Sequence, residues 1–186
     1  MAMDTPSDPV LSLEKDHQTV ANLFQSFTAA EPEERTDILQ NIVRELSVHA
    51  AVEEKEIYPV VRQAIPEGDR LADEAEADHQ RMKEMLADLD GADASAPEVE
   101  SQVNALRDEL LAHVEEEQVE ILQQLRWSLP PTEFTALGER LEEARKSAPT
   151  RPHPRTSAGG ATEKVAAVID KARDAVRGDS GDDEEG

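Results

Sequence analysis

The 186-residue sequence contains no cysteine, and this absence excludes disulfides, thiolate metal sites, iron–sulfur clusters and cysteine nucleophiles together. Any bound metal must therefore be held by nitrogen and oxygen atoms. Aromatic residues make up only 3% of the chain, and alternating β-branched segments are missing, whereas Ala, Glu and Leu are abundant. This composition predicts an all-helical protein.

Long apolar runs are also missing. No segment approaches the roughly twenty consecutive apolar residues that a membrane span needs. The N-terminus shows neither the basic region nor the apolar run of a secretion signal. We therefore expect a cytoplasmic protein.

Positive charge is scarce, because 19 Lys and Arg face 42 Asp and Glu, which gives a formal net charge of -23. Such a chain repels phosphate backbones and anionic membranes, so we expect neither nucleic acid nor a membrane as a partner. Excess carboxylates are most simply a solvated acidic surface. The charge alone does not identify a cation.

Four stretches carry apolar residues at gaps of three and four, which is the pattern of amphipathic helices. They cover residues from about 9 to 29, 32 to 65, 69 to 90 and 97 to 127. The connections between them are short, so neighbouring helices should be antiparallel. The pattern predicts an up-down antiparallel four-helix bundle.

Helix starts can be assigned from capping residues. Ser7 or Asp8 can cap a first helix that begins near Pro9. Ser95, followed by Glu98, has the form of a capping box for the fourth helix. Thr132 can cap a short fifth helix that packs over the end of the bundle.

The C-terminal part of the chain has a different composition. Residues 147–160 are rich in Pro, Ser, Thr and Gly and are predicted to be a linker, with His153 between prolines and not a ligand. Residues 162–177 form a plausible amphipathic helix that docks on the bundle or binds a protein partner, and residues 178–186 are an acidic, disordered end. We therefore divide the chain into a bundle with its capping helix at 9–146 and a tail at 147–186.

A His followed four residues later by Glu occurs twice, at His49–Glu53 and at His113–Glu117. Residues four apart lie on one face of a helix, so each pair can direct an imidazole and a carboxylate toward one point. His17 and His79 also fall within apolar stripes. Helical rise places all these residues at the same height of the bundle to within roughly one turn. Buried imidazoles and carboxylates are costly unless they have partners, and a shared metal site provides them.

Four histidines and two carboxylates are too many for one tetrahedral zinc ion. If Glu53 and Glu117 each bridge two ions and the imidazoles divide two and two, each ion has four protein ligands and keeps open positions. Mixed imidazole and carboxylate donors with open positions favour iron or manganese. The pattern therefore predicts a site for two metal ions in the bundle core.

The order of these residues resembles that of the hemerythrin-like HHE cation-binding family over roughly residues 9–127. The resemblance implies an up-down bundle with a non-haem di-iron centre. The ligands that it implies are His17, His49, Glu53, His79, His113 and Glu117. The family's oxygen carriers have a second His four residues after the third-helix His and an Asp five residues after the fourth-helix His, where this sequence has Lys83 and Gln118. These differences argue against simple oxygen carriage.

Tyr58, the only tyrosine, resembles a tyrosine that precedes Pro in some bacterial members of the family. It could provide an additional phenolate ligand in place of the missing imidazole. Ideal helix geometry, however, places Tyr58 about 180° from His49, so this role requires a local break such as Pro59 could cause. The alternative is that Tyr58 packs beside the site without binding metal.

Glu14-x-x-His17 and Glu76-x-x-His79 also match the Glu-x-x-His element of ferritin-like di-iron proteins. That scheme uses two histidines and leaves His49 and His113 unexplained, so we expect Glu14 and Glu76 to lie at the surface or behind the ligands.

The sequence favours a di-iron protein that binds or reacts with dioxygen, hydrogen peroxide or nitric oxide, with a role in oxidative stress. It could act as a peroxide-consuming or nitric-oxide-reactive enzyme. The alternative is a metal- or redox-sensing module that signals through its tail, and a metal-free scaffold is a third option. The sequence shows no nucleophile with an orienting base and no glycine-rich phosphate loop.

Overall fold

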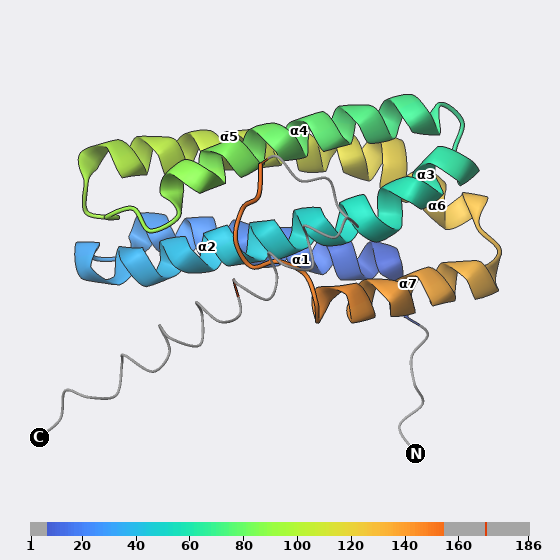
Figure 1. Cartoon of the computed structure of the whole chain (residues 1–186), viewed down its shortest axis with the longest axis horizontal. Coiled ribbons are helices and arrows are strands. Elements are labelled where there is room, and N and C mark those ends of the chain that lie inside the picture. The colour runs from blue at the N-terminus through green and yellow to red at the C-terminus, as the bar shows by residue number, and fades with distance from the viewer. Residues whose placement is uncertain (1–6, 155–169, 171–186) are drawn as a thin grey trace, which may run out of the picture.

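The computed structural model describes residues 7–154 and residue 170, and all regular secondary structure in this part of the chain is helical. Four long helices lie side by side in an antiparallel bundle, as Figure 1 shows. They are α1 (Pro9–Ala29), α2 (Pro32–Val52), α4 (Gly68–Leu89) and α5 (Pro97–Glu117). The predicted all-helical, antiparallel four-helix bundle is therefore confirmed.

Two of the long helices continue beyond a short π-helical turn. The turn η1 (Glu53–Ile57) connects α2 to α3 (Tyr58–Ala64). The turn η2 (Gln118–Leu122) connects α5 to α6 (Gln123–Ser128). A fifth long segment, α7 (Pro131–Arg145), packs against α1, α2 and η1 near the end of the bundle where α3 and α6 lie (Figure 1).

Proline marks the start of α1, α2, α5 and α7, where its missing N–H costs nothing. Asp8 caps α1 as expected, because its carboxylate accepts a hydrogen bond from the backbone N–H of Leu11 at 3.0 Å. The other two predicted caps are wrong. Ser95 bonds instead to the side chain of Asp93, and α5 begins after Ala96 without a side-chain cap. Thr132 lies inside α7, which begins after Pro130.

The core consists of two apolar clusters with a polar layer between them. One cluster contains Leu13, Val52, Leu71 and Ile121, and the other contains Val20, Leu46, Met82 and Leu110. On each of the four long helices the buried or nearly buried histidine separates residues of one cluster from residues of the other. The fold therefore brings one histidine from each helix to the same level.

Among residues 7–154 and 170, no helix is long and apolar enough to cross a membrane. The amphipathic helix predicted for residues 162–177 lies outside the described residues, apart from Asp170. That residue is buried, and its carboxylate accepts hydrogen bonds from the backbone N–H groups of Thr150 and Arg151. His153 Nε2 also lies 3.1 Å from Asp170 Oδ2, and His153 belongs to neither group of residues that could hold a metal ion.

Candidate metal centre

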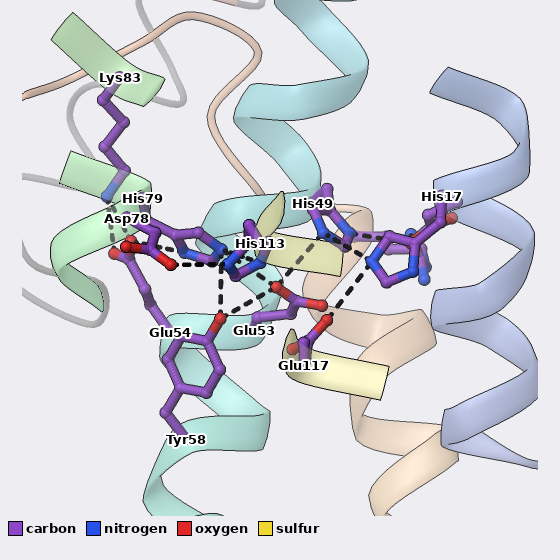
Figure 2. Close-up of polar contacts among 12 residues, drawn as sticks. His17, His49, Glu53, Glu54, Tyr58, Asp78, His79, Lys83, His113 and Glu117 are labelled. Carbon is purple, nitrogen blue, oxygen red and sulfur yellow. Dashed lines mark hydrogen bonds and ion pairs between the residues drawn. The ribbon is translucent and has the colours of Figure 1, made fainter. Parts of the chain in front are cut away.

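Four imidazoles meet in the polar layer, one each from α1, α2, α4 and α5 (Figure 2). The Nε2 atoms of His17 and His49 are 3.2 Å apart, and those of His79 and His113 are also 3.2 Å apart. These two close pairs divide the centre into a His17–His49 half and a His79–His113 half. All four histidines predicted from the sequence therefore come together.

Two carboxylates lie among these imidazoles. Glu53 Oε2 is 3.3 Å from His49 Nε2 and 3.2 Å from His79 Nε2, so it touches both halves. Glu117 Oε2 is 3.4 Å from His17 Nε2. Figure 2 shows both carboxylates directed at the space between the imidazoles. Two groups of four residues have potential ligand atoms that all lie within 4.8 Å of one another. One group is His49, Glu53, His79 and His113, and the other is His17, His49, Glu53 and Glu117.

The carboxylates are buried and incompletely bonded. Glu53 is 0% exposed and Glu117 is 2% exposed, yet Oε1 of Glu53 and both oxygens of Glu117 have no hydrogen-bond partner among the described residues. Burying such groups without a partner costs several kcal/mol, roughly 2 to 7 for a neutral polar group and more for a charge. Oxygen and nitrogen donors arranged in this way fit one or more metal cations, which would pair with the unbonded oxygens.

Burial and mutual repulsion also shape the ionisation of these groups. Burial raises the pKa of Glu53 well above its ordinary value, and the nearby Glu117 raises it further. Burial opposes ionisation of Glu117 too, but His17 and the charge of His113 lower its pKa to about 2. Burial lowers the pKa of His49 to about 4. Around neutral pH the His49 imidazole is therefore neutral, which is the form that binds metal.

Tyr58 extends into the same cluster. Its hydroxyl lies 3.2 Å from Glu53 Oε2 and 3.1 Å from His79 Nε2, and the side chain is fully buried. The π-turn explains this position, because the backbone N–H of Tyr58 bonds to the carbonyl of Glu53, five residues earlier. In a regular α-helix residues five apart point about 140° apart, whereas in a π-turn they lie nearly above one another. The local break that Tyr58 needs in order to reach the site is thus the π-turn η1, which ends two residues before Pro59.

Comparison with known proteins now identifies the family. The profile of the hemerythrin HHE cation binding domain matches residues 8–125. The chain belongs to the hemerythrin HHE cation-binding family. As a member of this family it is a metal-binding protein, and the His/Glu cluster is its candidate metal site.

Two curated relatives and one solved structure are similar to this hemerythrin-like chain. An uncharacterized hemerythrin-like protein of Schizosaccharomyces pombe is 29% identical over 86% of this chain and 82% of its own length. A DNA nickase of Nostoc is 29% identical over 69% of this chain but only 38% of its own length. The crystal structure of a hemerythrin HHE cation binding domain-containing protein from Mycobacterium kansasii has a TM-score of 0.61 and 25% identity, covering 75% of this chain and 88% of that one.

Three carboxylates that the sequence patterns did not predict lie around the hemerythrin-like centre. Each faces the Nδ1 atom of an imidazole whose Nε2 points inward. Asp16 Oδ2 is 3.7 Å from His49 Nδ1, and Asp78 Oδ2 is 3.6 Å from His113 Nδ1. Glu54 Oε1 is 3.1 Å from His79 Nδ1. Such carboxylates fix the orientation of an imidazole and increase its basicity as a metal ligand.

A repeated dipeptide could have revealed two of these carboxylates. Asp16-His17 on α1 and Asp78-His79 on α4 place an aspartate directly before a histidine on both helices. Each aspartate turns toward the histidine of the neighbouring helix rather than toward its own neighbour in the sequence. Burial opposes ionisation of Asp16, but His49 and Arg145, which lies 2.5 Å from the carboxylate, together lower the pKa of Asp16 below its ordinary value.

The two positions that differ from the family's oxygen carriers lie outside the cluster. The amine of Lys83 bonds both oxygens of Glu54, at 2.6 and 2.7 Å, and closes the outer side of His79. Gln118 is exposed and donates to Glu14 at 3.4 Å. Glu76 pairs with Arg62 at 3.0 Å. Glu14 and Glu76 belong to neither set of potential ligands, as the hemerythrin-like interpretation requires.

Two openings lead from the surface to the hemerythrin-like centre. A groove of about 820 Å³ between α1 and α5 reaches His17, and its walls include Ala21, Phe24, Leu110 and Val114. His17 is accordingly the most exposed of the four imidazoles, with 9% of its side-chain surface accessible against 0 to 3% for the others. A smaller opening of about 320 Å³ between α4 and α5 reaches the other half.

Proposed function

We propose that the buried cluster is a di-iron centre that binds or reacts with small oxidants such as dioxygen, hydrogen peroxide or nitric oxide. The observation that supports this most is the convergence of four Nε2 atoms on two buried carboxylates, of whose four oxygens only Glu53 Oε2 makes a hydrogen bond among the described residues. Six donors suit two ions, and mixed imidazole and carboxylate donors suit iron, with manganese as the second choice.

The short contacts favour a particular division of the ligands. His17 and His49 would bind one ion, and His79 and His113 the other, because the Nε2 atoms pair in this way. A carboxylate has two oxygens and can join two ions, which is the role we assign to Glu53 and to Glu117. Bound iron would supply open coordination positions and a change of oxidation state with which small oxidants react.

The two halves are not equivalent. Tyr58 touches His79, and the Lys83–Glu54 pair covers the outer side of that ring. Leu122, five residues after Glu117 as Tyr58 is after Glu53, has no group that could bind metal. We propose that Tyr58 is a further ligand in the His79–His113 half. An oxidant would then bind in the His17–His49 half, which the apolar groove makes accessible.

Neutral oxidants are suited to this route. The groove is lined mainly by apolar side chains, which exclude charged solutes more strongly than dioxygen or nitric oxide. DNA nicking is not part of the proposed function. The similarity to the DNA nickase of Nostoc covers only 38% of that protein, and the net charge of -23 opposes contact with phosphates.

The proposal is tested by adding oxidants to iron-loaded protein. The absorption spectrum should change on addition of hydrogen peroxide to the oxidised form, or of nitric oxide to the reduced form. Glu53→Gln keeps the shape of the side chain but removes its charge, so this variant should bind less iron and respond less. A parent protein that binds iron but responds to none of these oxidants would refute the reactive role.

A sensing module is the second candidate, favoured by the docking of Asp170 on Thr150 and Arg151. This contact joins Asp170 to the chain that leaves α7. Removing residues 155–186 distinguishes the two functions. A protein whose role is turnover should keep its peroxide consumption, whereas a sensor should keep its metal but lose its binding to a partner protein.

A further inference from the structure

The smaller opening has a strongly acidic lining. It lies between α4 and α5 and reaches His113 and Glu117 at its inner end. Four further carboxylates line it, against a single cationic side chain. They are Glu74, Asp78, Glu116 and Glu120, and the cation is Arg70.

Two of these carboxylates have no function in the fold. Glu116 and Glu120 are exposed and, among the described residues, neither side chain has an ion-pair or hydrogen-bond partner. They lie four residues apart, where like charges repel and weaken a helix. Arg70 does not neutralise them, because it is bonded to Glu67 and Glu74. The opening therefore keeps unpaired negative charge at its mouth.

The inner end of the opening also carries a carboxylate without a hydrogen bond. Glu117 is 2% exposed and lines the opening, and among the described residues its carboxylate makes no hydrogen bond, its Oε2 lying 3.4 Å from His17 Nε2. His113, also 2% exposed, lies beside it with Nε2 directed at His79. Carboxylates thus line the opening from the surface to the buried donors, and the apolar side chains among them are Leu71, Ala75 and Ile121.

The contrast with the groove separates two kinds of solute. The lining of the groove at His17 is mainly apolar in area, with Gln18, Gln25, Thr28 and Gln118 as neutral polar side chains. Its charged residues, apart from His17 itself, are Glu14 and Arg107, one of each sign. A hydrated divalent cation would lose solvation there without gaining opposite charge. A neutral molecule would not suffer this cost. The acidic opening has the reverse preference, because a cleft lined by one sign of charge concentrates ions of the other.

We propose that the α4–α5 opening is the path by which a divalent metal cation reaches the buried site, with Glu116 and Glu120 as its first, transient binding position. This inference rests on the proposed metal-binding function of the cluster. Carboxylates at the mouth collect the cation, and Glu117 then accepts it beside His113. The groove at His17 is left to neutral ligands.

Loading kinetics test the path without reference to activity. Fe²⁺ is added anaerobically to metal-free full-length protein, and unbound Fe²⁺ is trapped by a chelator at timed intervals. Glu116→Lys with Glu120→Lys should lower the loading rate about tenfold at low ionic strength, within the range of electrostatic steering. The final metal content should equal that of the parent. Added salt should slow the parent much more than this variant.

Two control variants isolate the opening. Glu33→Lys with Glu34→Lys makes the same change in net charge in the first turn of α2, roughly 22 Å along the helix from His49, and should load at nearly the parent rate. Ala21→Leu narrows the groove and should also leave the rate unchanged. Circular dichroism checks that each variant is folded.

Four results would overturn the proposal. Equal loading of the Glu116/Glu120 and Glu33/Glu34 variants would mean that only net charge matters. Slow loading of Ala21→Leu would make the groove the path. Reduced final metal content in the Glu116/Glu120 variant would make these residues part of the site itself. A parent protein that binds no Fe²⁺ would remove the proposed function and this path together.

Discussion

Three of the four imidazoles in the cluster, those of His49, His79 and His113, face a carboxylate at Nδ1. Asp16, Glu54 and Asp78 face three Nδ1 atoms, and these contacts direct the opposite nitrogens inward. The six inward donors were predictable because polar residues inside an apolar stripe demand a partner. The outer carboxylates were not, because an aspartate or glutamate near a helix surface looks like any solvated acidic residue in a chain with 42 of them.

Tyr58→Phe tests the proposed phenolate ligand. The phenol oxygen lies 3.1 Å from His79 Nε2 and 3.2 Å from Glu53 Oε2, so Phe at this position removes a potential oxygen ligand and leaves the six His and Glu donors in place. We expect iron content to be nearly unchanged and a visible absorption band, arising from charge transfer from phenolate to ferric iron, to disappear. A visible spectrum identical to that of the parent would show that Tyr58 only packs beside the site.

Lys83→Met tests the ion pair behind His79. Lys83 is 8% exposed, and its loss leaves the carboxylate of Glu54 without its cation. The free energy of unfolding in urea should fall by about 1 to 3 kcal/mol. Lys146→Met is the matched control, because its pair with Glu143 is exposed and should contribute about 0 to 1 kcal/mol.

A double variant separates the stability that comes from the Lys83–Glu54 ion pair from the stability that comes from packing of the two side chains. Lys83→Met combined with Glu54→Gln should be less destabilised than the sum of the single changes, since the uncompensated charge is gone. Strict additivity would show that the two side chains do not stabilise each other.

At the scale of helices, the two π-turns determine how the chain continues past the centre. The starts of α1 and α2 were predictable from Pro9 and Pro32 and from the cap at Asp8. The π-turn η1 was not, because apolar periodicity assumes a constant number of residues per turn. That assumption put Tyr58 on the far side of the helix. Pro59, which cannot donate to the carbonyl four residues earlier, was the only local sign of a change.

The corner between α3 and α4 depends on a close backbone approach. A Cβ at Gly68 would lie 2.1 Å from the carbonyl oxygen of Val61, and this oxygen belongs to a packed helix that cannot move freely. Gly68→Ala should therefore lower the free energy of unfolding by about 1 to 3 kcal/mol. Gly138→Ala serves as the comparison, because its Cβ would lie 2.7 Å from the carbonyl oxygen of Ser7, which precedes α1 and belongs to no helix. Equal losses in both variants, measured by urea unfolding, would contradict this account of the corner.

At the scale of the whole molecule, a polar layer interrupts what would otherwise be one apolar core. Without metal, this layer buries two carboxylates that repel each other, and burial with this repulsion raises the pKa of Glu53. A cation bound only by the folded state stabilises it in proportion to the logarithm of its free concentration. The fold should therefore be most stable with metal bound.

Metal removal gives a direct measure of this coupling. Chelation should lower the unfolding temperature of the parent. If the free metal had been present at 100 times its dissociation constant, the free energy of unfolding should fall by about 2.7 kcal/mol. His113→Ala should lower metal content and unfolding temperature together and should respond little to the chelator. If that variant is as stable as the metal-loaded parent, the cluster is a scaffold element and not a metal site.

The number of metal ions per chain tests the central claim most directly. Protein purified from iron-supplemented cells should contain about two iron ions per chain, as expected for a dinuclear site in a four-helix bundle, and should absorb in the near ultraviolet. Elemental analysis on the same sample that gives the spectrum provides both values. Only trace iron and manganese, with no absorption beyond that of Trp127 and Tyr58, would contradict the proposed centre.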